Sequence, residues 1–256
     1  MSPRLQVLSR FRSHILSTDR AIRVYLPPGY DGRKKQRYPV LYMNDGQNLF
    51  ESRTAFGGVD WKLGATADTL IAAGAIKPVI IVGIDNTGEK RIHEYTPTSH
   101  HAFRGSGRAD RYGRMLVEEL KPMIDLRYRT LPQRENHAIG GSSLGALVAL
   151  YVALSHSDVF SKVAVLSPSV WWHDRVIVQQ VAQLPARLPL DIWLDMGTTE
   201  SAEGISDARL LRDALTTRGW VSGTDLVYHE VEGGSHNERA WGTRAGDVLR
   251  FLFPRV

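Results

Sequence analysis

The sequence predicts an α/β protein in which a mostly parallel central sheet is covered by helices on both faces. Strand-like and helix-like segments alternate over 77–253, which is the order of elements typical of a parallel sheet. Several strand segments are apolar throughout, as strands buried on both faces are. The chain has 256 residues, of which 43% are hydrophobic, so it is long enough to build one large core. No repeat and no linker rich in proline, glycine or serine divides it, and we expect a single domain over 1–256.

The first third of the chain predicts an antiparallel entry into the sheet. Strand-like runs at 4–14 and 21–26 come before the chain breaker Pro27-Pro28-Gly29. A basic loop then leads to an apolar strand at 38–43.

After this entry the chain alternates between strands and helices. We expect strands at 77–84, 137–141, 162–166, 188–196 and 226–231, and helices at 112–125, 144–154, 207–218 and 237–253. Because ligands of such sheets bind at the carboxyl ends of the strands, residues that follow a strand are the candidates for a functional site.

A Gly-x-Ser-x-Gly pattern at 141–145 lies between a predicted strand and a predicted helix. This is the setting of a nucleophile elbow, a sharp turn that exposes a serine hydroxyl above the sheet. The turn needs small neighbours, which accounts for Gly141 and Gly145, and Ser143 is at its centre. We therefore predict Ser143 as the nucleophile and the backbone N–H of Leu144, at the helix N-terminus, as one donor to an oxyanion.

A nucleophilic serine needs a histidine base and a carboxylate that orients the base, in the chain order serine, acid, histidine. His236 follows two glycines in the loop between the last predicted strand and the last predicted helix. A loop at this place can reach over the elbow, and the other histidines of the chain lack this position. We predict His236 as the base.

The carboxylate has three candidates. Glu200 comes a few residues after the predicted strand 188–196, where the acid of such a triad belongs. Asp207 and Glu203 are close to it in the sequence, so position alone favours Glu200 and leaves the two others open.

The segment 44–48, Asn-Asp-Gly-Gln-Asn, follows the predicted strand 38–43. A second oxyanion donor is expected in a loop of this kind, and the N–H of Gln47 is our candidate. Asp45 is a candidate for binding the alcohol part of a substrate. An ordinary Asp-Gly turn would account for the same residues.

Two tryptophans follow the predicted strand 162–166 and lie near its carboxyl end. Trp171 and Trp172 are candidates for the wall of a substrate pocket. Packing in the core is the alternative.

Taken together, these segments resemble the esterase family of α/β-hydrolases, which includes siderophore esterases of the enterobactin type, feruloyl and acetyl-xylan esterases, S-formylglutathione hydrolase and mycolyltransferases. The resemblance extends over most of the chain. It rests on the segments 23–30 (RVYLPPGY), 44–50 (NDGQNLF), 94–97 (EYTP), 141–145 (GSSLG), 167–172 (SPSVWW) and 234–238 (GSHNE).

The resemblance implies an α/β-hydrolase fold and a serine carboxylic-ester hydrolase that acts through an acyl-enzyme intermediate and needs no metal or organic cofactor. It implies Ser143 as nucleophile, His236 as base, an acid at the position of Glu200, and oxyanion donors at Leu144 and at Gln47 or Gly46. Many relatives have His where this chain has Asn44, and Asp is common at the position of Glu200.

The substrate class implied by the resemblance is a small carbohydrate, hydroxycinnamoyl or siderophore ester. An acyltransferase with the same triad is one alternative, and a noncatalytic binding protein on the same fold is another. The sequence does not indicate the acyl group, the leaving alcohol or the oligomeric state.

The charge pattern argues against nucleic acid or membrane as a partner. The net charge is +5, and the basic run 33–37 is short, lies in a loop and has no interleaved aromatics. No apolar run approaches the length of a membrane span, and the N-terminus lacks a secretory apolar region, so we expect a cytoplasmic protein. Walker loops, dinucleotide-binding glycine motifs and zinc-binding spacings are absent from the sequence, and we expect no metal site.

Overall fold

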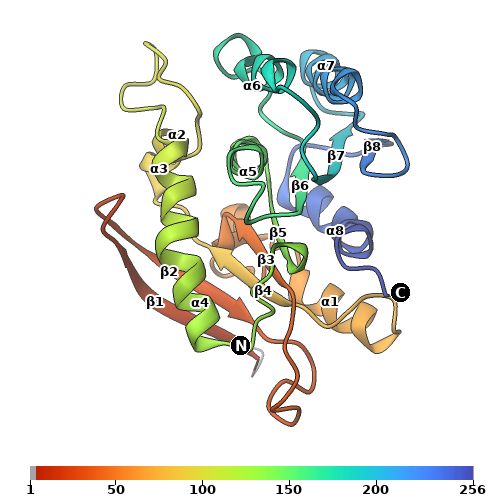
Figure 1. Ribbon diagram of the computed structural model, residues 1–256. Helices are drawn as coiled ribbons and strands as arrows, with labels where there is room; N and C mark the ends of the chain where they lie inside the picture. The colour runs from red at the N-terminus through yellow and green to blue at the C-terminus, as the bar shows by residue number, and fades with distance from the viewer. Residues whose placement is uncertain (1–3, 256) are drawn as a thin grey trace.

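The computed structural model describes residues 4–255 and places its eight strands in one sheet, in the order β1-β2-β4-β3-β5-β6-β7-β8 (Figure 1). The strands are β1 (Leu5–Ser13), β2 (Thr18–Tyr25), β3 (Val40–Asn44), β4 (Ile80–Ile84), β5 (His137–Ser142), β6 (Lys162–Leu166), β7 (Asp191–Gly197) and β8 (Leu226–Val231). β1 and β2 pair antiparallel, as do β2 and β4, and the remaining neighbours pair parallel. The predicted antiparallel entry and mostly parallel sheet are confirmed.

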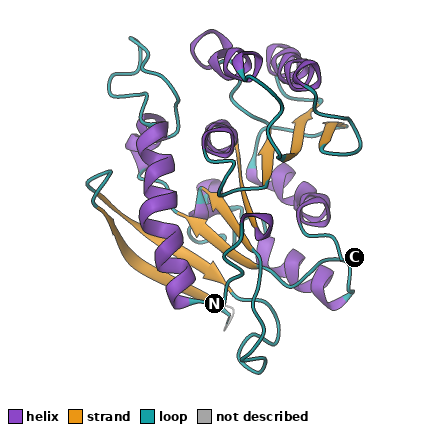
Figure 2. Ribbon diagram, in the orientation of Figure 1, coloured by secondary structure: helices purple, strands orange, loops and turns teal. Residues whose placement is uncertain are grey.

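Helices cover both faces of this sheet (Figure 2). They are α1 (Leu63–Ala72), α2 (Arg91–Glu94), α3 (Ala109–Arg114), α4 (Lys121–Arg127), α5 (Leu144–Ser155), α6 (Trp172–Gln183), α7 (Ala202–Arg218) and α8 (Glu238–Leu252). No helix within residues 4–255 is both long and apolar enough to cross a lipid bilayer.

The two faces of the sheet carry separate hydrophobic cores, because successive side chains of a strand point to opposite faces. In β3, Tyr42 contributes to the core that includes α5 and α7, whereas Leu41 and Met43 contribute to the core that includes α1 and α8. Every residue of β3, β4 and β5 is buried, as the uniformly apolar strand segments predicted.

The structure adds two long helices that the sequence did not predict, α1 and α6. α1 contains Gly64 and two threonines, which weaken its helical signal, and no side chain caps its N-terminus. α6 begins irregularly, because residues 173–175 have left-handed backbone angles. The predicted helix at 112–125 is part of a longer run in which α3 and α4 are joined by a π-helical segment, Met115–Leu120.

His137, the first residue of β5, is fully buried and packs edge-on against Tyr42. Burial and the nearby Lys121 lower its pKa from 6.5 to about 4. His137 therefore binds its proton at higher pH in the unfolded chain than in the folded chain. As the pH falls from about 6.5 to 4, protonation of the unfolded chain lowers the free energy of unfolding. Between neutral pH and pH 4, the pKa difference at His137 lowers the free energy of unfolding by about 3 kcal/mol.

We expect His137→Phe, which keeps an aromatic ring, to remove this part of the pH dependence. Urea unfolding at several pH values between 4 and 7.5 measures it, with His14→Phe at an exposed site as the control. If the wild type and His137→Phe lost stability in parallel on acidification, His137 would not be the group responsible.

Candidate active site

Ser143 is at the sharp turn between β5 and α5, with φ 57° and ψ −126°. A side chain is rarely held in such a conformation unless the surrounding structure enforces it. Both neighbouring glycines are sterically required: a Cβ atom on Gly141 would lie 2.6 Å from the carbonyl oxygen of Gly145, and one on Gly145 would lie 2.8 Å from a carboxylate oxygen of Asp45. The local sequence therefore forms the predicted elbow.

The hydroxyl of Ser143 lies at the N-terminus of a twelve-residue helix. The first N–H groups of a helix have no partner within it, so the Leu144 amide is available beside this hydroxyl. The Ser143 Oγ is 3.3 Å from the Oγ of Ser169, which belongs to the SPS motif at 167–169.

Ser143 opens into a pocket of about 400 Å³ that also brings together Glu200, His236, Leu144 and Trp171. These residues are far apart in the sequence and come from the ends of β5, β6, β7 and β8, at the carboxyl edge of the sheet. The remaining lining residues are Pro168, Ser169, Val170, Met196, Ser201, Gly204 and Asp207.

The loop after β8 carries His236, whose Nδ1 lies 2.6 Å from Oε2 of Glu200. The edge of the imidazole packs against Trp241, with ring centroids 4.9 Å apart. A carboxylate at Nδ1 favours the tautomer with its proton on that nitrogen, which leaves Nε2 free to accept a proton.

Glu200 is held by contacts on both of its oxygens. Oε1 accepts hydrogen bonds from the Ser167 hydroxyl at 2.6 Å and from the Gly197 amide at 2.9 Å. Burial alone would raise the pKa of Glu200, but the hydrogen bonds from His236, Ser167 and Gly197 outweigh it and hold that pKa below its ordinary value. The carboxylate is therefore ionised at neutral pH.

The two other acidic candidates have different surroundings, although Asp207 also lines the Ser143 pocket. Glu203 is exposed on the first turn of α7. Asp207 is buried and accepts a hydrogen bond from Arg175 at 2.5 Å. The carboxylate that contacts the His236 ring is thus that of Glu200 rather than that of either of these residues.

Behind Glu200 lies a buried polar cluster that the sequence did not predict. Ser167 accepts hydrogen bonds from Trp241 Nε1 at 3.0 Å and from Arg244 at 2.9 Å. Arg244 also pairs with Asp195 at 2.7 Å. The SPS motif at 167–169 was a signal for Ser167, whereas nothing in the helical pattern of α8 singled out Arg244.

The loop after β3 places Gln47 in a single 3₁₀ turn, Gly46–Asn48. Gly46 packs tightly against Gly83, because a Cβ atom on Gly46 would lie 2.4 Å from the carbonyl carbon of Gly83. Asn44 ties this loop to the elbow, because its Nδ2 donates to the carbonyl oxygen of Gly145 at 2.7 Å. In turn Asn44 accepts a hydrogen bond from the buried Tyr112 hydroxyl.

Asp45, predicted to contact substrate, has both carboxylate oxygens engaged by protein groups. Arg91 donates to both of them at 2.8 Å, and Asn86 donates to Oδ1 at 2.7 Å. Asp45 itself has a left-handed backbone conformation. These contacts brace the loop that carries Gln47.

The two tryptophans differ in their surroundings. Trp171 is 52% exposed and lines the Ser143 pocket. Trp172 is fully buried, and its Nε1 donates to the carbonyl oxygen of Thr98 at 3.2 Å. Only the first of the pair borders the pocket. Within the part of the chain that the structure describes, no cluster of three or more histidine or acidic side chains has the arrangement of a metal site.

Comparisons with known proteins agree with this architecture. The family model described as "Putative esterase" matches residues 13–250. The chain is 30% identical over 236 residues to an endo-1,4-beta-xylanase/feruloyl esterase of Xylanibacter ruminicola, covering 90% of this chain and 29% of that protein. A siderophore triacetylfusarinine C esterase of Aspergillus fumigatus is 26% identical over 147 residues, which is 56% of this chain and 48% of that protein.

The chain thus spans less than half the length of these two relatives. Among solved structures, an IroE-like serine hydrolase from Shewanella oneidensis has the same fold, with a TM-score of 0.78 and 23% identity over 97% of this chain and 80% of that one. Since the family model extends over nearly the whole chain, this protein belongs to the Putative esterase family and has its α/β-hydrolase fold.

Proposed function

We propose that this protein hydrolyses carboxylic esters with Ser143 as the nucleophile. The observation that carries the proposal is that Ser143, His236 and Glu200 line one pocket, with the imidazole hydrogen-bonded to the carboxylate at 2.6 Å. A serine hydroxyl attacks an ester only with such a base, and the base needs such an orienting carboxylate.

The reaction proceeds in two steps. His236 takes the proton of Ser143 as its oxygen attacks the ester carbonyl, and the N–H groups of Leu144 and Gln47 donate to the developing oxyanion. His236 then protonates the leaving alcohol, which departs from an acyl-enzyme. Water, deprotonated by the same imidazole, attacks the acyl group, releases the acid and restores Ser143.

The relatives suggest the substrate class. One is named a feruloyl esterase and another a siderophore esterase, so we place a hydroxycinnamoyl, carbohydrate or siderophore ester in the pocket of this chain. Leu144, Val170, Trp171 and Met196 give the pocket apolar walls, which suit an acyl group.

Covalent trapping tests this proposal. We expect a fluorophosphonate to abolish hydrolysis of p-nitrophenyl and feruloyl esters, and mass spectrometry of the digested protein to find one adduct on the peptide that contains Ser143. The expected adduct stays on that peptide in Ser169→Ala, whose hydroxyl is 3.3 Å away. Turnover without an adduct, or an adduct on Ser169, would contradict the assignment.

A further inference from the structure

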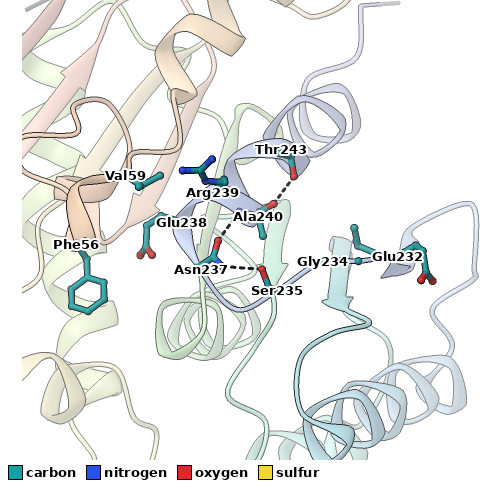
Figure 3. A pocket seen from close by; sticks show the side chains of 13 residues that line it. Phe56, Val59, Glu232, Gly234, Ser235, Asn237, Glu238, Arg239, Ala240 and Thr243 are labelled. Atoms are coloured by element: carbon teal, nitrogen blue, oxygen red, sulfur yellow. Dashed lines mark hydrogen bonds between the residues drawn. The ribbon is translucent and has the colours of Figure 1, made fainter.

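A second hollow, of about 490 Å³, lies beside the loop that carries His236 (Figure 3). His236 lines the Ser143 pocket, whereas Ser235 and Asn237, on either side of it in the sequence, line this second hollow. One short stretch of chain therefore borders both spaces. The opposite wall of the second hollow is the loop at 56–59, which carries Phe56.

Asn48 connects the walls of this hollow to the catalytic loops. Its Nδ2 donates to Oε1 of Glu238 at 3.0 Å, and its Oδ1 accepts from the backbone N–H of Phe56 at 2.9 Å. Asn48 is buried and directly follows Gln47 in the chain. The hollow is thus built from the same loops that hold the proposed oxyanion donor and base.

The chemistry of the lining differs from that of the Ser143 pocket. Phe56 is 77% exposed, an unusual environment for a large aromatic side chain, and Glu238 and Arg239 contribute opposite charges. Arg239 forms no ion pair with any residue of the described chain, 4–255. An aromatic face beside charged hydrogen-bonding groups suits a ring that carries several hydroxyls, because the ring stacks and its hydroxyls bond at the edge.

We propose that this hollow is a subsite for the alcohol part of the substrate, and that it takes a polyhydroxylated ring such as a sugar. The inference rests on the proposed ester hydrolysis. His236 must deliver its proton to the leaving oxygen, so the alcohol lies on the side of the imidazole, and the loop that carries the imidazole also lines this hollow through Ser235 and Asn237. The acyl group then binds in the apolar Ser143 pocket.

The test compares two esters of the same carboxylic acid. This acid is the one whose p-nitrophenyl ester the protein hydrolyses fastest. One is the methyl ester and the other is the ester at the primary hydroxyl of arabinofuranose. We expect wild type to have at least a tenfold higher kcat/KM for the sugar ester. Phe56→Ala should reduce this ratio to near 1, and Phe56→Tyr, which keeps the ring, should restore it.

Glu238→Gln, which retains an oxygen for Asn48, should lower the ratio through a higher KM for the sugar ester. Leu126→Ala, at an exposed site on α4, is the control that keeps the ratio. Equal rates for the two esters in wild type, or an unchanged ratio in Phe56→Ala, would overturn the subsite. Failure of the proposed function is distinguishable, since neither ester and no p-nitrophenyl ester would then be hydrolysed.

A separate observation concerns Arg244, which is 4% exposed at its side chain and lies behind the Glu200 carboxylate. Its guanidinium bonds to Ser167 and Asp195, and its second terminal nitrogen is 3.5 Å from Oε1 of Glu200. Gly197 and Gly234 make room for it, because a Cβ atom at either position would come within 2.8 Å of that nitrogen.

The geometry points to Arg244 as a positioning residue that holds Glu200 charged and oriented toward His236. A buried carboxylate needs a nearby positive charge or donors to remain ionised. The titratable or charged groups facing Glu200 are His236 on one side and Arg244, with Asp195 behind it, on the other. Ser167 links Arg244 to Glu200, because its hydroxyl accepts a hydrogen bond from Arg244 and donates one to Glu200.

We expect Arg244→Gln to lower kcat at least tenfold with KM nearly unchanged, and to move the acidic limb of the pH profile of kcat/KM to higher pH. Arg244→Lys should restore much of kcat. Because Arg244→Gln leaves Asp195 buried without its positively charged partner, Asp195→Asn/Arg244→Gln serves as a second variant that removes both charges. An unshifted acidic limb in the folded double variant, or a change confined to KM, would overturn this role.

Discussion

Replacing Ser143 with alanine is expected to lower kcat/KM for the best ester substrate by about 10⁴- to 10⁶-fold, while the protein stays folded. The substitution removes the oxygen that we propose as the attacking atom, so the remaining activity would depend only on substrate binding and the oxyanion donors. The backbone at this position is already held at φ 57° by the elbow, and alanine adds no bulk to it. Steady-state hydrolysis with circular dichroism as a check on folding measures the effect.

Ser169→Ala is the matched control for this prediction. Its hydroxyl lies 3.3 Å from Ser143 Oγ, and it lines the same pocket. We expect it to lose no more than about tenfold, because the hydroxyl is not the attacking atom. If instead Ser169→Ala were inactive and Ser143→Ala retained activity, the nucleophile would be the serine after β6 rather than the serine of the elbow.

The second large effect is expected for Glu200→Gln, with a loss of about 10³- to 10⁴-fold in kcat. Glutamine has nearly the shape of glutamate, so the contacts to Ser167 and Gly197 need little change in space. However, it cannot stabilise the imidazolium that forms when His236 takes the proton, and its amide can present an N–H to Nδ1 and favour the wrong tautomer. Steady-state kinetics with one p-nitrophenyl ester measures the change.

The two other candidate carboxylates provide the comparison for Glu200→Gln. Glu203→Gln is expected to behave as wild type because the side chain is exposed on α7. Asp207→Asn weakens the pair with Arg175 at the edge of the pocket, so we expect a change mainly in KM. A loss of kcat in Asp207→Asn larger than that in Glu200→Gln would reassign the orienting acid.

The elements nearest Ser143 were predictable because their signals are local. The strand 162–166 and the strand 226–231 have the predicted bounds, and the helix after Ser143 extends one residue beyond its predicted end. Runs of apolar residues set the strand period, and the glycines at 141 and 145 are the residues that so sharp a turn requires. The position of His236 was predictable for the same reason, since a glycine-containing loop between a strand and a helix is a local pattern.

Other parts of the fold had no local signal. α1 contains Gly64 and two threonines and has no side-chain cap. It is held by packing: Trp61, just before it, lies against Trp241 of α8 with ring centroids 6.0 Å apart and the rings tilted by 42°. The start of α6 depends on left-handed residues that no propensity favours. These helices are stabilised by packing against segments that are distant in the chain. A single sequence does not show which distant segments pack together.

The sequence by itself determined the order of strands and helices and the sharp turn at Ser143, and it predicted a short set of residues as candidates to act with that serine. Only the tertiary structure distinguishes the three acidic candidates, because Glu200, Glu203 and Asp207 are close in the chain and Glu200 is the one whose carboxylate contacts the His236 ring. The same is true of Arg244, Ser167 and Asn48, whose contacts join residues at least eight and as many as 190 positions apart. The physical reason is that periodicity and turn chemistry act between neighbours in the chain, whereas burial and ion pairing act between neighbours in space.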